Sequence, residues 1–356
     1  MSLGQIQQVK TLVPRRRLRQ LKQRADGPAW LFLAGHAAFL TLTTLLVRAA
    51  MGTAWLIPAM ATQGIGIVHL FSAQHEFAHR TAFRTRWLND LFGSVFGTLI
   101  MLPHVNFRWE HTDHHSFTQA TGRDPQLIPQ PKSLWAYGSY LSTIPYWRGF
   151  LRPFVRHLFG VVTLEERRFT PASELWKSIW EARAMGAVYA AAVALSLVLH
   201  TSVLLYYWLL PRLMAEPFMR FVRMTEHVGR PVDEPDLLLN SRTCLTWAPL
   251  RWLAWNMPFH AEHHLCPGVP FHALPALHAQ LRGVERRIYT GYLDAHREIL
   301  ARALDARRAA ATTIKTDTTI AGEAAIKTTM SEGMNHELER EAVLCNRRHL
   351  ERRPGA

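Results

Sequence analysis

The sequence predicts an all-α integral membrane protein in which about four transmembrane helices form two hairpins beneath a cytosolic helical cap. Three observations support this fold class. Long apolar segments occur in two pairs, although the mean hydropathy of the 356 residues is only −0.05. Basic residues precede the first pair, in a chain whose formal net charge is +14. Histidines recur in three closely spaced motifs, which we expect the cap to carry.

Residues 1–28 form a basic segment that we expect to lie in the cytosol. The segment contains RRRLRQLKQR but no apolar stretch of the kind found in a cleavable signal peptide. Arginine and lysine next to a membrane span favour the cytoplasmic side. A solvated basic tail is compatible with the same composition, and both interpretations place the N-terminus in the cytoplasm.

The first hairpin is predicted from residues 29–47 and 51–71. The first of these segments contains one histidine and no charged residue. About twenty apolar residues suffice to cross the hydrocarbon layer. Only a short link separates the two segments, so the chain returns to the side on which it started.

Residues 91–102 are apolar but too few to cross a bilayer, so we expect a re-entrant or interfacial segment there. From 103 to 183 the chain mixes Trp, Arg and Pro with apolar residues, as in YLSTIPYWRGFLRPFVRHLFG. This composition is typical of amphipathic helices that lie in the headgroup layer. The chain therefore stays on one side of the membrane between the two hairpins.

Residues 184–200 and 203–221 are predicted to form the second hairpin. As one helix, the apolar stretch from 185 to 221 would be roughly 55 Å long, which exceeds the ~30 Å hydrocarbon layer. Two spans that turn near HTS at 200–202 fit this length better. The membrane domain then extends over residues 29–305.

The remaining composition restricts the function classes. Residues 306–356 are rich in Thr and Ala and poor in aromatic residues, so we expect a disordered, cytoplasmic C-terminal tail. The three cysteines include no CxxC pair, which argues against a disulfide framework or a cysteine zinc site. The positive charge suits nucleic acid or an anionic membrane surface, and without a nucleic-acid-binding motif we favour the membrane.

The histidine motifs HEFAH, HTDHH and HAEHH indicate a metal centre. Positions i, i+3 and i+4 share one face of a helix, so each motif directs its imidazoles the same way. Neutral imidazole is a good ligand for iron, zinc, copper and nickel. A single tetrahedral zinc takes three or four ligands, so a larger set favours two metal ions. The candidate ligands are His75, His79, His111, His114, His115, His260, His263 and His264, with His227 in RMTEHVGR as a ninth.

A shared metal centre constrains the topology. The first two motifs lie on one face of the membrane only if residues 91–102 do not cross it. His227 and the third motif share that face only if residues 185–221 cross twice. The metal hypothesis and the segment lengths therefore require the same second hairpin. The basic N-terminus places the centre on the cytoplasmic face of the cell inner membrane.

With these motifs in this order, residues 29–290 resemble the membrane fatty acid desaturase superfamily, which includes acyl desaturases, acyl and alkane hydroxylases, and carotenoid hydroxylases or ketolases. The matching stretches are HEFAH, HTDHH, TGRDP, TEHVG and NMPFHAEHHLCPGVPFHALPALH. The resemblance implies a non-haem diiron centre held by the nine histidines, O₂ as co-substrate and a lipid acyl chain as substrate, with fatty acid desaturase as the first interpretation. It also implies a separate electron donor, such as ferredoxin or rubredoxin with its reductase, and the positive charge suits an acidic donor.

Carboxylates and one amide near the motifs are candidates for orienting the imidazoles. A metal-bound histidine commonly donates its second N–H to such a group. Ordinary solvent contact is the alternative for each of them. These outer residues are Glu76, Asp113, Asp124, Asn256 and Glu262.

Functions of other classes are compatible with parts of the sequence. HEFAH matches the HExxH signature of zinc metalloproteases, in which the glutamate acts as general base. A membrane protease leaves HTDHH and HAEHH unexplained, and the one Asp-Gly pair, Asp26-Gly27, precedes every apolar segment. A metal transporter would line its spans with histidines, but only His36, His69 and His200 lie inside or beside the apolar segments, and we expect each of them to be a packed or interfacial histidine. Within the superfamily, hydroxylation or ketolation of an acyl, alkane or carotenoid substrate is the alternative to desaturation, because these reactions share an oxidant.

Overall fold

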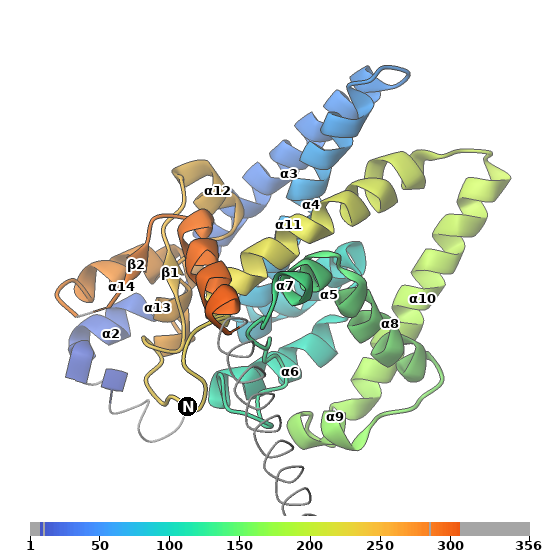
Figure 1. Cartoon of the computed structure of the whole chain (residues 1–356). Helices are drawn as coiled ribbons and strands as arrows, with labels where there is room; N and C mark the ends of the chain where they lie inside the picture. The colour runs from blue at the N-terminus through green and yellow to red at the C-terminus, as the bar shows by residue number, and fades with distance from the viewer. Residues whose placement is uncertain (1–7, 10, 285, 307–356) are drawn as a thin grey trace, which may run out of the picture.

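A computed structural model of the chain describes residues 8–9, 11–284 and 286–306, and the regular structure in them is mostly helical. Within these residues, three helices are long and apolar enough to cross a membrane, namely α3 (Asp26–Ala50), α4 (Leu56–His79) and α10 (Leu175–Val198). The α3–α4 hairpin and α10 extend from a denser group of shorter helices (Figure 1). The tail predicted at 306–356 lies, apart from residue 306, outside the described residues.

The first predicted hairpin corresponds to α3 and α4. α4 continues past the predicted end of its span to His79, so the HEFAH motif occupies the last turns of the same helix. Gly52 lies in the turn between the two helices with a φ of +77°, a conformation that glycine adopts without strain. The Nε2 atom of His36 on α3 lies 2.8 Å from the carbonyl oxygen of Gly66 on α4, so one nitrogen of this buried ring has a hydrogen-bond partner inside the hairpin.

α4 is the central helix of the fold. In the most apolar 18 residues of α4, 61% are buried inside the protein, against 22% in the corresponding stretch of α3 and 11% in that of α10. α4 packs against α3, against α5 (Arg86–Ile100) and against α11 (Leu210–His227). Gly64 permits the close approach of α11, because a Cβ at this position would collide with Pro211 and Ala215. The end of α4 that carries HEFAH is therefore held from several sides.

The apolar stretch at 91–102 ends in a sharp turn. Met101, with a φ of +61°, terminates α5, and α6 (His104–Ser116) begins shortly after it. α6 packs against both α4 and α5, which brings HTDHH next to HEFAH. The exposed apolar face of α5 consists of Trp87, Leu91, Val95 and Leu99.

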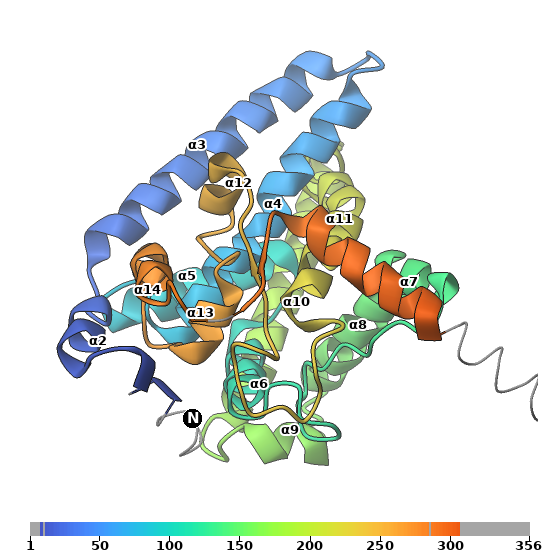
Figure 2. The ribbon, with the colours of Figure 1, turned by 60° about the vertical axis from the view of Figure 1, so that its left-hand side comes forward.

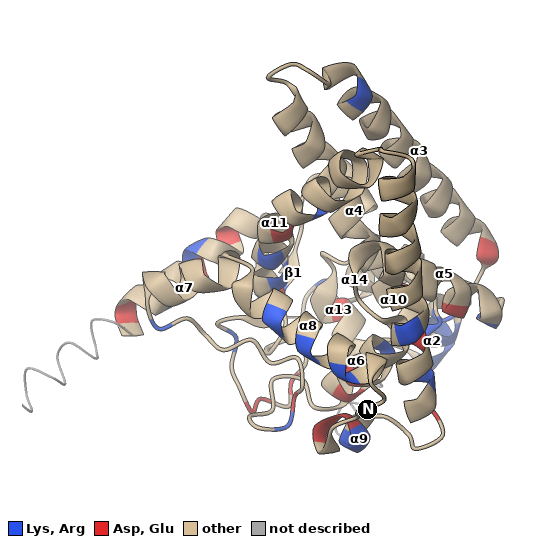
Figure 3. Ribbon diagram, turned by 90° about the vertical axis from the view of Figure 1, so that its right-hand side faces the viewer, with Lys and Arg blue, Asp and Glu red and all other residues tan. Residues whose placement is uncertain are grey.

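Three short helices connect α6 to α10. In the second of them, Phe150 and Phe154 are buried, whereas Ile144, Leu151 and Val155 on its other side are exposed. Figure 3 shows most of the charged residues away from the turn between α3 and α4, so that end of the molecule is mainly uncharged. The connecting helices are α7 (Leu134–Leu141), α8 (Ile144–Leu158) and α9 (Leu164–Phe169).

The second predicted hairpin is helical, but only one of its two arms is apolar. Residues 184–200 fall largely within α10, whereas 203–221 correspond to the π-helical turn η1 (Leu205–Leu209) and most of α11. Among the described helices, α11 is not one of the three that are apolar enough to cross a membrane. The reason is a set of charged side chains, all of them buried: Arg212, Glu216, Arg220 and Arg223.

These buried charges of α11 are paired with one another and with neighbouring helices. Arg212 contacts Glu216 and donates a hydrogen bond of 3.0 Å to the carbonyl oxygen of Ile100 at the end of α5. The Nε atom of Arg220 lies 2.5 Å from Oε1 of Glu216. The guanidinium carbon of Arg220 lies 4.0 Å from the ring centroid of Tyr146 on α8. The charges therefore join α11 to α5 and α8.

The cap lies beside the ends of α4 and α11 that carry the histidines (Figures 1 and 2). Two short strands pair in parallel within it, with Thr243 opposite Ile288, so the fold is mainly rather than wholly helical. Residues 292–306 form a further helical segment. The elements of the cap are β1 (Thr243–Cys244), α12 (Ala248–Leu253), α13 (His260–Leu265), the 3₁₀ turn η2 (Phe271–Ala273), α14 (Leu274–Gln280) and β2 (Ile288–Tyr289).

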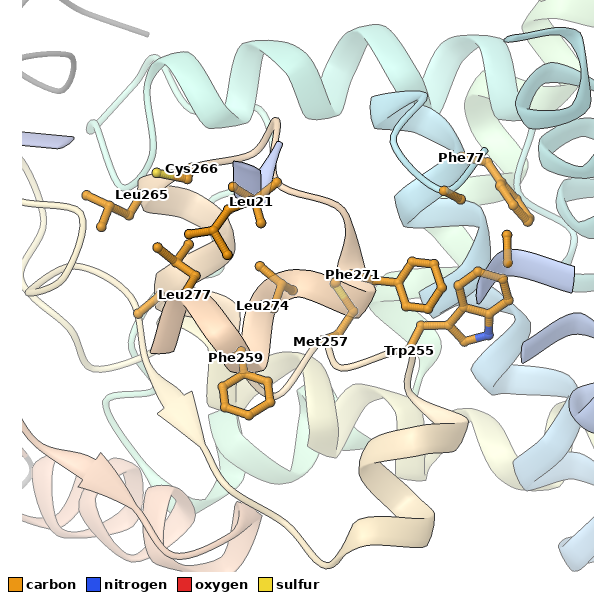
Figure 4. Close-up of a cluster of buried hydrophobic side chains, with 14 of the residues drawn as sticks. Leu21, Phe77, Trp255, Met257, Phe259, Leu265, Cys266, Phe271, Leu274 and Leu277 are labelled. Carbon is orange, nitrogen blue, oxygen red and sulfur yellow. The ribbon is translucent and has the colours of Figure 1, made fainter. Parts of the chain in front are cut away.

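The largest hydrophobic core joins the N-terminal segment to the cap. Leu21, at the end of α2 (Arg15–Leu21), is buried together with Leu265 of α13 and Leu277 of α14 (Figure 4). Val13, ahead of α2, is fully buried in the same core. The basic segment predicted at 1–28 is therefore more than a solvated flank, because its apolar residues pack under the third histidine motif.

Candidate metal centre

The nine predicted imidazoles come from four elements and meet at one place. α4 provides two of them at its C-terminal end, α6 provides three, α11 provides one at its last residue, and α13 provides three. Eight of the nine side chains are buried, and His79 is half-buried. Helical spacing explains the convergence, because residues at i, i+3 and i+4 face the same way on α6 and on α13.

Five imidazoles form what we call the first imidazole group. Each offers one nitrogen, and these nitrogens all lie within 4.8 Å of one another. The Nε2 atom of His263 is 3.1 Å from Nε2 of both His79 and His115, and Nε2 of His115 is 3.0 Å from Nε2 of His111. The first imidazole group consists of His75, His79, His111, His115 and His263.

The other four imidazoles form the second imidazole group. His114, His227 and His264 each offer a nitrogen within 4.8 Å of the others. The Nε2 atom of His227 is 2.9 Å from Nε2 of His260 and 3.1 Å from Nε2 of His264. The two groups adjoin, since the rings of His115 and His264 stack with centroids 4.1 Å apart.

The arrangement of nitrogen atoms fits a pair of metal ions. Nitrogen ligands lie about 2.1 Å from a metal such as zinc, which places neighbouring ligands of one ion roughly 3 Å apart. Imidazoles that point their Nε2 atoms at each other at this distance share one proton at most, so lone pairs remain for a cation. Among the described residues, the two groups are the sets of side chains that could hold a metal. A single tetrahedral zinc would leave most of these nitrogens without a role.

Burial keeps the imidazoles in the neutral form that binds metals. Burial, followed by neighbouring imidazoles, lowers the pKa of His115 and of His264 well below its ordinary value. The same two causes lower the pKa of His260. Neutral imidazole can accept a metal without first losing a proton, so the site is ready to bind at neutral pH.

Hydrogen bonds on the outer nitrogens fix two rings of α6. The Nδ1 atom of His114 lies 2.8 Å from Oδ1 of Asp124, and Nδ1 of His111 lies 2.9 Å from Oε1 of Gln126. An acceptor at Nδ1 keeps the proton there and leaves Nε2 free for a metal. Asp124 also accepts the backbone N–H of Gln119 and of Gln126. Burial alone would raise the pKa of Asp124, but the hydrogen bond from His114 and these backbone N–H groups lower it, so the carboxylate stays charged.

Three of the groups that back the imidazoles are absent from the sequence analysis. They are Gln126, the hydroxyl of Thr118, 3.1 Å from Nδ1 of His264, and the backbone carbonyl of Asn240, 3.1 Å from Nδ1 of His227. The position of Gln126, two residues after Asp124, is a local signal that could have identified it. A backbone carbonyl carries no residue-type signal, so Asn240 could not have been found in this way.

Of the five outer residues expected from the sequence, Asp124 is the one with a hydrogen bond to a candidate ligand. Asp113 lies 3.5 Å from the guanidinium of Arg168. Asn256 donates to the carbonyl oxygen of Phe271. The carboxylate of Glu262 accepts hydrogen bonds from Thr243, His278 and Arg286 and so joins α13 to the rest of the cap.

Glu76 bears on the metalloprotease alternative. Its carboxylate accepts hydrogen bonds from the hydroxyl of Thr81 and from the backbone N–H of Phe271, and Oε1 lies 3.6 Å from Nδ1 of His263. Glu76 thus lies behind an imidazole, on the side of Nδ1, whereas a general base would have to face a metal-bound water. Asp26 accepts hydrogen bonds from Arg84 and Thr85 at the start of α5. Neither carboxylate is placed as a protease requires.

Comparison with known proteins gives one family and several partial relatives. The sequence profile described as "Fatty acid desaturase" matches residues 54–295. The chain is 32% identical over 84 residues to "Omega-6 fatty acid desaturase, endoplasmic reticulum" of Brassica juncea, which covers 23% of this chain and 22% of that protein. It is 30% identical over 84 residues to "Fatty acid conjugase FAC2 B" of Calendula officinalis, covering 24% and 23%. It is 29% identical over 116 residues to "sn-1 acyl-lipid omega-3 desaturase (ferredoxin)" of Nostoc sp., covering 32% of both. The aligned part therefore spans less than a third of the length of each of these relatives.

Proposed function

The chain belongs to the fatty acid desaturase family, and from this premise we propose that it is an integral membrane oxidoreductase that uses O₂ and two iron ions to oxidise a lipid acyl chain. The first candidate reaction is desaturation. The observation that carries the proposal is the convergence of nine imidazoles in two adjoining groups. Two groups of this size suit two metal ions, and iron has the redox chemistry that zinc lacks.

The proposed ligands are the members of the two imidazole groups. Bound iron would supply the oxidant that removes hydrogen from an unactivated C–H bond after reduction of O₂. The residues of the chain hold the rings and exclude water. Asp124, Gln126 and Thr118 fix three rings through Nδ1, and burial keeps bulk water from the centre. The ligands of the proposed iron pair are His75, His79, His111, His114, His115, His227, His260, His263 and His264.

Hydroxylation or ketolation of an acyl, alkane or carotenoid substrate is the second candidate reaction. It would use the same oxidant and differ in how the substrate is held after the first hydrogen is removed. The partial relatives include desaturases and a conjugase, so related chains carry out more than one reaction. The names of the relatives favour an acyl substrate for this chain.

We propose that both hairpins cross the membrane and that the centre and both termini lie in the cytoplasm. α3 and α4 form the first hairpin, and α10 with η1 and α11 forms the second. The charges of α11 are compatible with a membrane position because they are buried and paired inside the protein. The four ligand-bearing elements can meet on one face only with this topology. A reporter placed in the loop at residue 120 and one at residue 268 should give the same orientation.

An acidic electron donor, ferredoxin or rubredoxin with its reductase, fits the formal charge of +14. The name of the Nostoc relative includes ferredoxin, which supports the first of these donors.

The experiment that tests the function combines metal analysis with product analysis. The full chain is purified in nanodiscs, its metals are measured, and it is supplied with reduced ferredoxin, O₂ and phospholipids. We expect about two irons per chain and a new double bond in the acyl chains. A new hydroxyl or keto group would select the second reaction. One zinc per chain and no oxidised lipid would refute both.

A further inference from the structure

Two cavities of very different size meet at Phe71. The larger, which we call the outer chamber, has a volume of about 580 Å³ and lies between α6, α8 and α11. The smaller, which we call the inner slot, has a volume of about 20 Å³ and lies between α4, α11 and the cap. Phe71 on α4 lines both of them, so its side chain forms part of the wall that separates them.

The inner slot reaches both imidazole groups. His75 of the first group and His260 of the second line it, together with the small side chains of Ser72 and Thr225. A cavity of about this size holds roughly one water molecule. A methylene chain therefore cannot enter the slot unless a side chain in its wall moves.

The outer chamber has the mixed lining that a lipid requires. The cavity is lined by three arginines, the hydroxyl groups of Tyr140 and Tyr146, three carboxylates and the apolar surface of Phe150 and Ile128. The arginines are Arg156, Arg220 and Arg223, and the carboxylates are Glu110, Glu165 and Glu166. Such a mixed lining suits the zwitterionic headgroup and ester region of a phospholipid, whereas the apolar walls suit the beginning of its acyl chain. On α8, Ile144, Leu151 and Val155 are exposed and are not among the residues that line the chamber. This apolar surface next to the chamber suits contact with lipid.

Phe71 is a half-buried wall residue that lines both cavities. Its ring centroid is 5.5 Å from that of Phe107 and 6.2 Å from that of His75. The guanidinium carbon of Arg223 lies 5.1 Å from the same ring. Arg223 lines the outer chamber and pairs with Glu226, which lines the inner slot, so an ion pair braces α11 beside Phe71. The open volume next to the phenyl ring is that of the outer chamber.

We propose that Phe71 is a gate through which the acyl chain of a membrane lipid passes from the outer chamber into the inner slot, and that the size of this side chain decides which carbon lies beside the two imidazole groups. The proposal rests on the proposed function for the meaning of that position. A smaller residue would let the chain slide further past the imidazoles. A larger one would hold it back in the outer chamber.

The first experiment compares the products of Phe71→Ala and Phe71→Trp with those of the unmodified protein, all as full chains in nanodiscs. One methylene in an apolar pocket is worth about tenfold or more in selectivity. We therefore expect Phe71→Ala to change the ratio of products at adjacent carbon positions, read by mass spectrometry, by at least about tenfold. Phe71→Trp should lose turnover while its bound metal is unchanged. Identical product positions in all three proteins would overturn the proposal.

Phe218→Ala is the matched control. Phe218 is also a half-buried phenylalanine that packs against the same hydrophobic cluster, but it lines neither cavity. Its product positions should equal those of the unmodified protein. A shift of the same size in Phe218→Ala would mean that loosening the cluster, rather than opening a gate, moves the chain.

The second experiment measures binding without turnover. Nanodiscs contain a phosphatidylcholine whose acyl chain carries a diazirine at mid-chain, and the samples are irradiated under nitrogen without reductant. Cross-links should fall on outer-chamber residues in the unmodified protein and move to Ser72 or Thr225 in Phe71→Ala. Cross-links outside both cavities, or the same residues in both proteins, would contradict the gate. Because this readout needs no oxidation, it tests the gate even if the proposed function fails.

Discussion

α3 and α11 both pack against α4, but their side chains are distributed in opposite ways. α3 exposes Leu31, Leu42 and Leu45 and carries no charge between its first and last turns. α11 buries two arginines and a glutamate in an ion-paired network that reaches α5 and α8. The exposed helix α3 is therefore apolar, as its composition predicts. An enclosed helix can be apolar or charged, because α4 is largely buried and apolar, whereas α11 is buried and charged, and both lead directly to the candidate metal centre.

The largest expected contrast between these two helices concerns their buried histidines. His227→Ala, at the end of α11, should abolish turnover and lower bound iron, because Nε2 of His227 lies within 3.1 Å of two other imidazoles. His36→Ala on α3 should keep both, because Nε2 of His36 faces only the carbonyl of Gly66. Oxidised lipid and iron per chain are the measurements. An equal loss of oxidised lipid and bound iron in the two variants would contradict the assignment of His227, but not His36, as a metal ligand.

The next largest effect is expected for the ion-paired network. Glu216→Ala leaves Arg212 and Arg220 buried without their carboxylate, and breaking a buried pair in this way costs about 3–5 kcal/mol. Leu45→Ala on α3 removes an exposed apolar side chain and should change stability by no more than about 0.5 kcal/mol. The melting temperature in nanodiscs reports both. Equal melting temperatures for Glu216→Ala and Leu45→Ala would show that the ion-paired network does not stabilise the packing of α11.

A smaller effect is expected in the loop after α6 that contains Asp124, which belongs to neither α3 nor α11. Asp124→Asn preserves the size of the side chain but removes the charge that faces Nδ1 of His114. Loss of such a partner typically lowers metal affinity about 10- to 100-fold. Competition with a chelator of known affinity measures this change. Asp113→Asn is the control, since Asp113 pairs with Arg168 and should leave the affinity unchanged.

The smallest effect is expected inside the first hairpin. Thr43 of α3 donates a hydrogen bond to Gln63 of α4, and Thr43→Val removes it while keeping the shape of the side chain. Hydrogen bonds between helices in a membrane contribute about 0.6 kcal/mol on average. The melting temperature should therefore fall by far less than in Glu216→Ala. A comparable fall would mean that α3 also depends on polar contacts.

The apolar helices of the fold could be predicted from the sequence. Residues 29–47 and 51–71 form a helical hairpin as expected, because their apolar side chains are continuous and their link is short. The predicted second hairpin corresponds to α10 and to η1 with α11, of which only α10 is apolar enough to cross a membrane. The burial of the charged residues in its second arm could not be predicted, because hydropathy does not distinguish a paired, enclosed arginine from an exposed one.

The convergence of the imidazoles was also predictable, whereas the groups behind them were mostly not. Spacing alone places His111, His114 and His115 on one face of α6. The same spacing puts Asp113, two residues from His111, on a different face, where Arg168 meets it. Asn240 contacts His227 through its backbone carbonyl, and the hydroxyl of Thr118 contacts His264 because the chain turns just after α6. Residue type says little about such contacts, since they are set by how the chain turns.

The continuity of α4 has a mechanical consequence. One uninterrupted helix runs from Leu56 to His79, so a helix that is long and apolar enough to cross a membrane also holds the first two candidate imidazoles. Helices adapt to a change in bilayer thickness by tilting. A tilt of α4 displaces His75 and His79 against partners held by α6 and α13. With the proposed membrane position of α4, the thickness of the surrounding lipid layer would act directly on the geometry of the proposed metal centre.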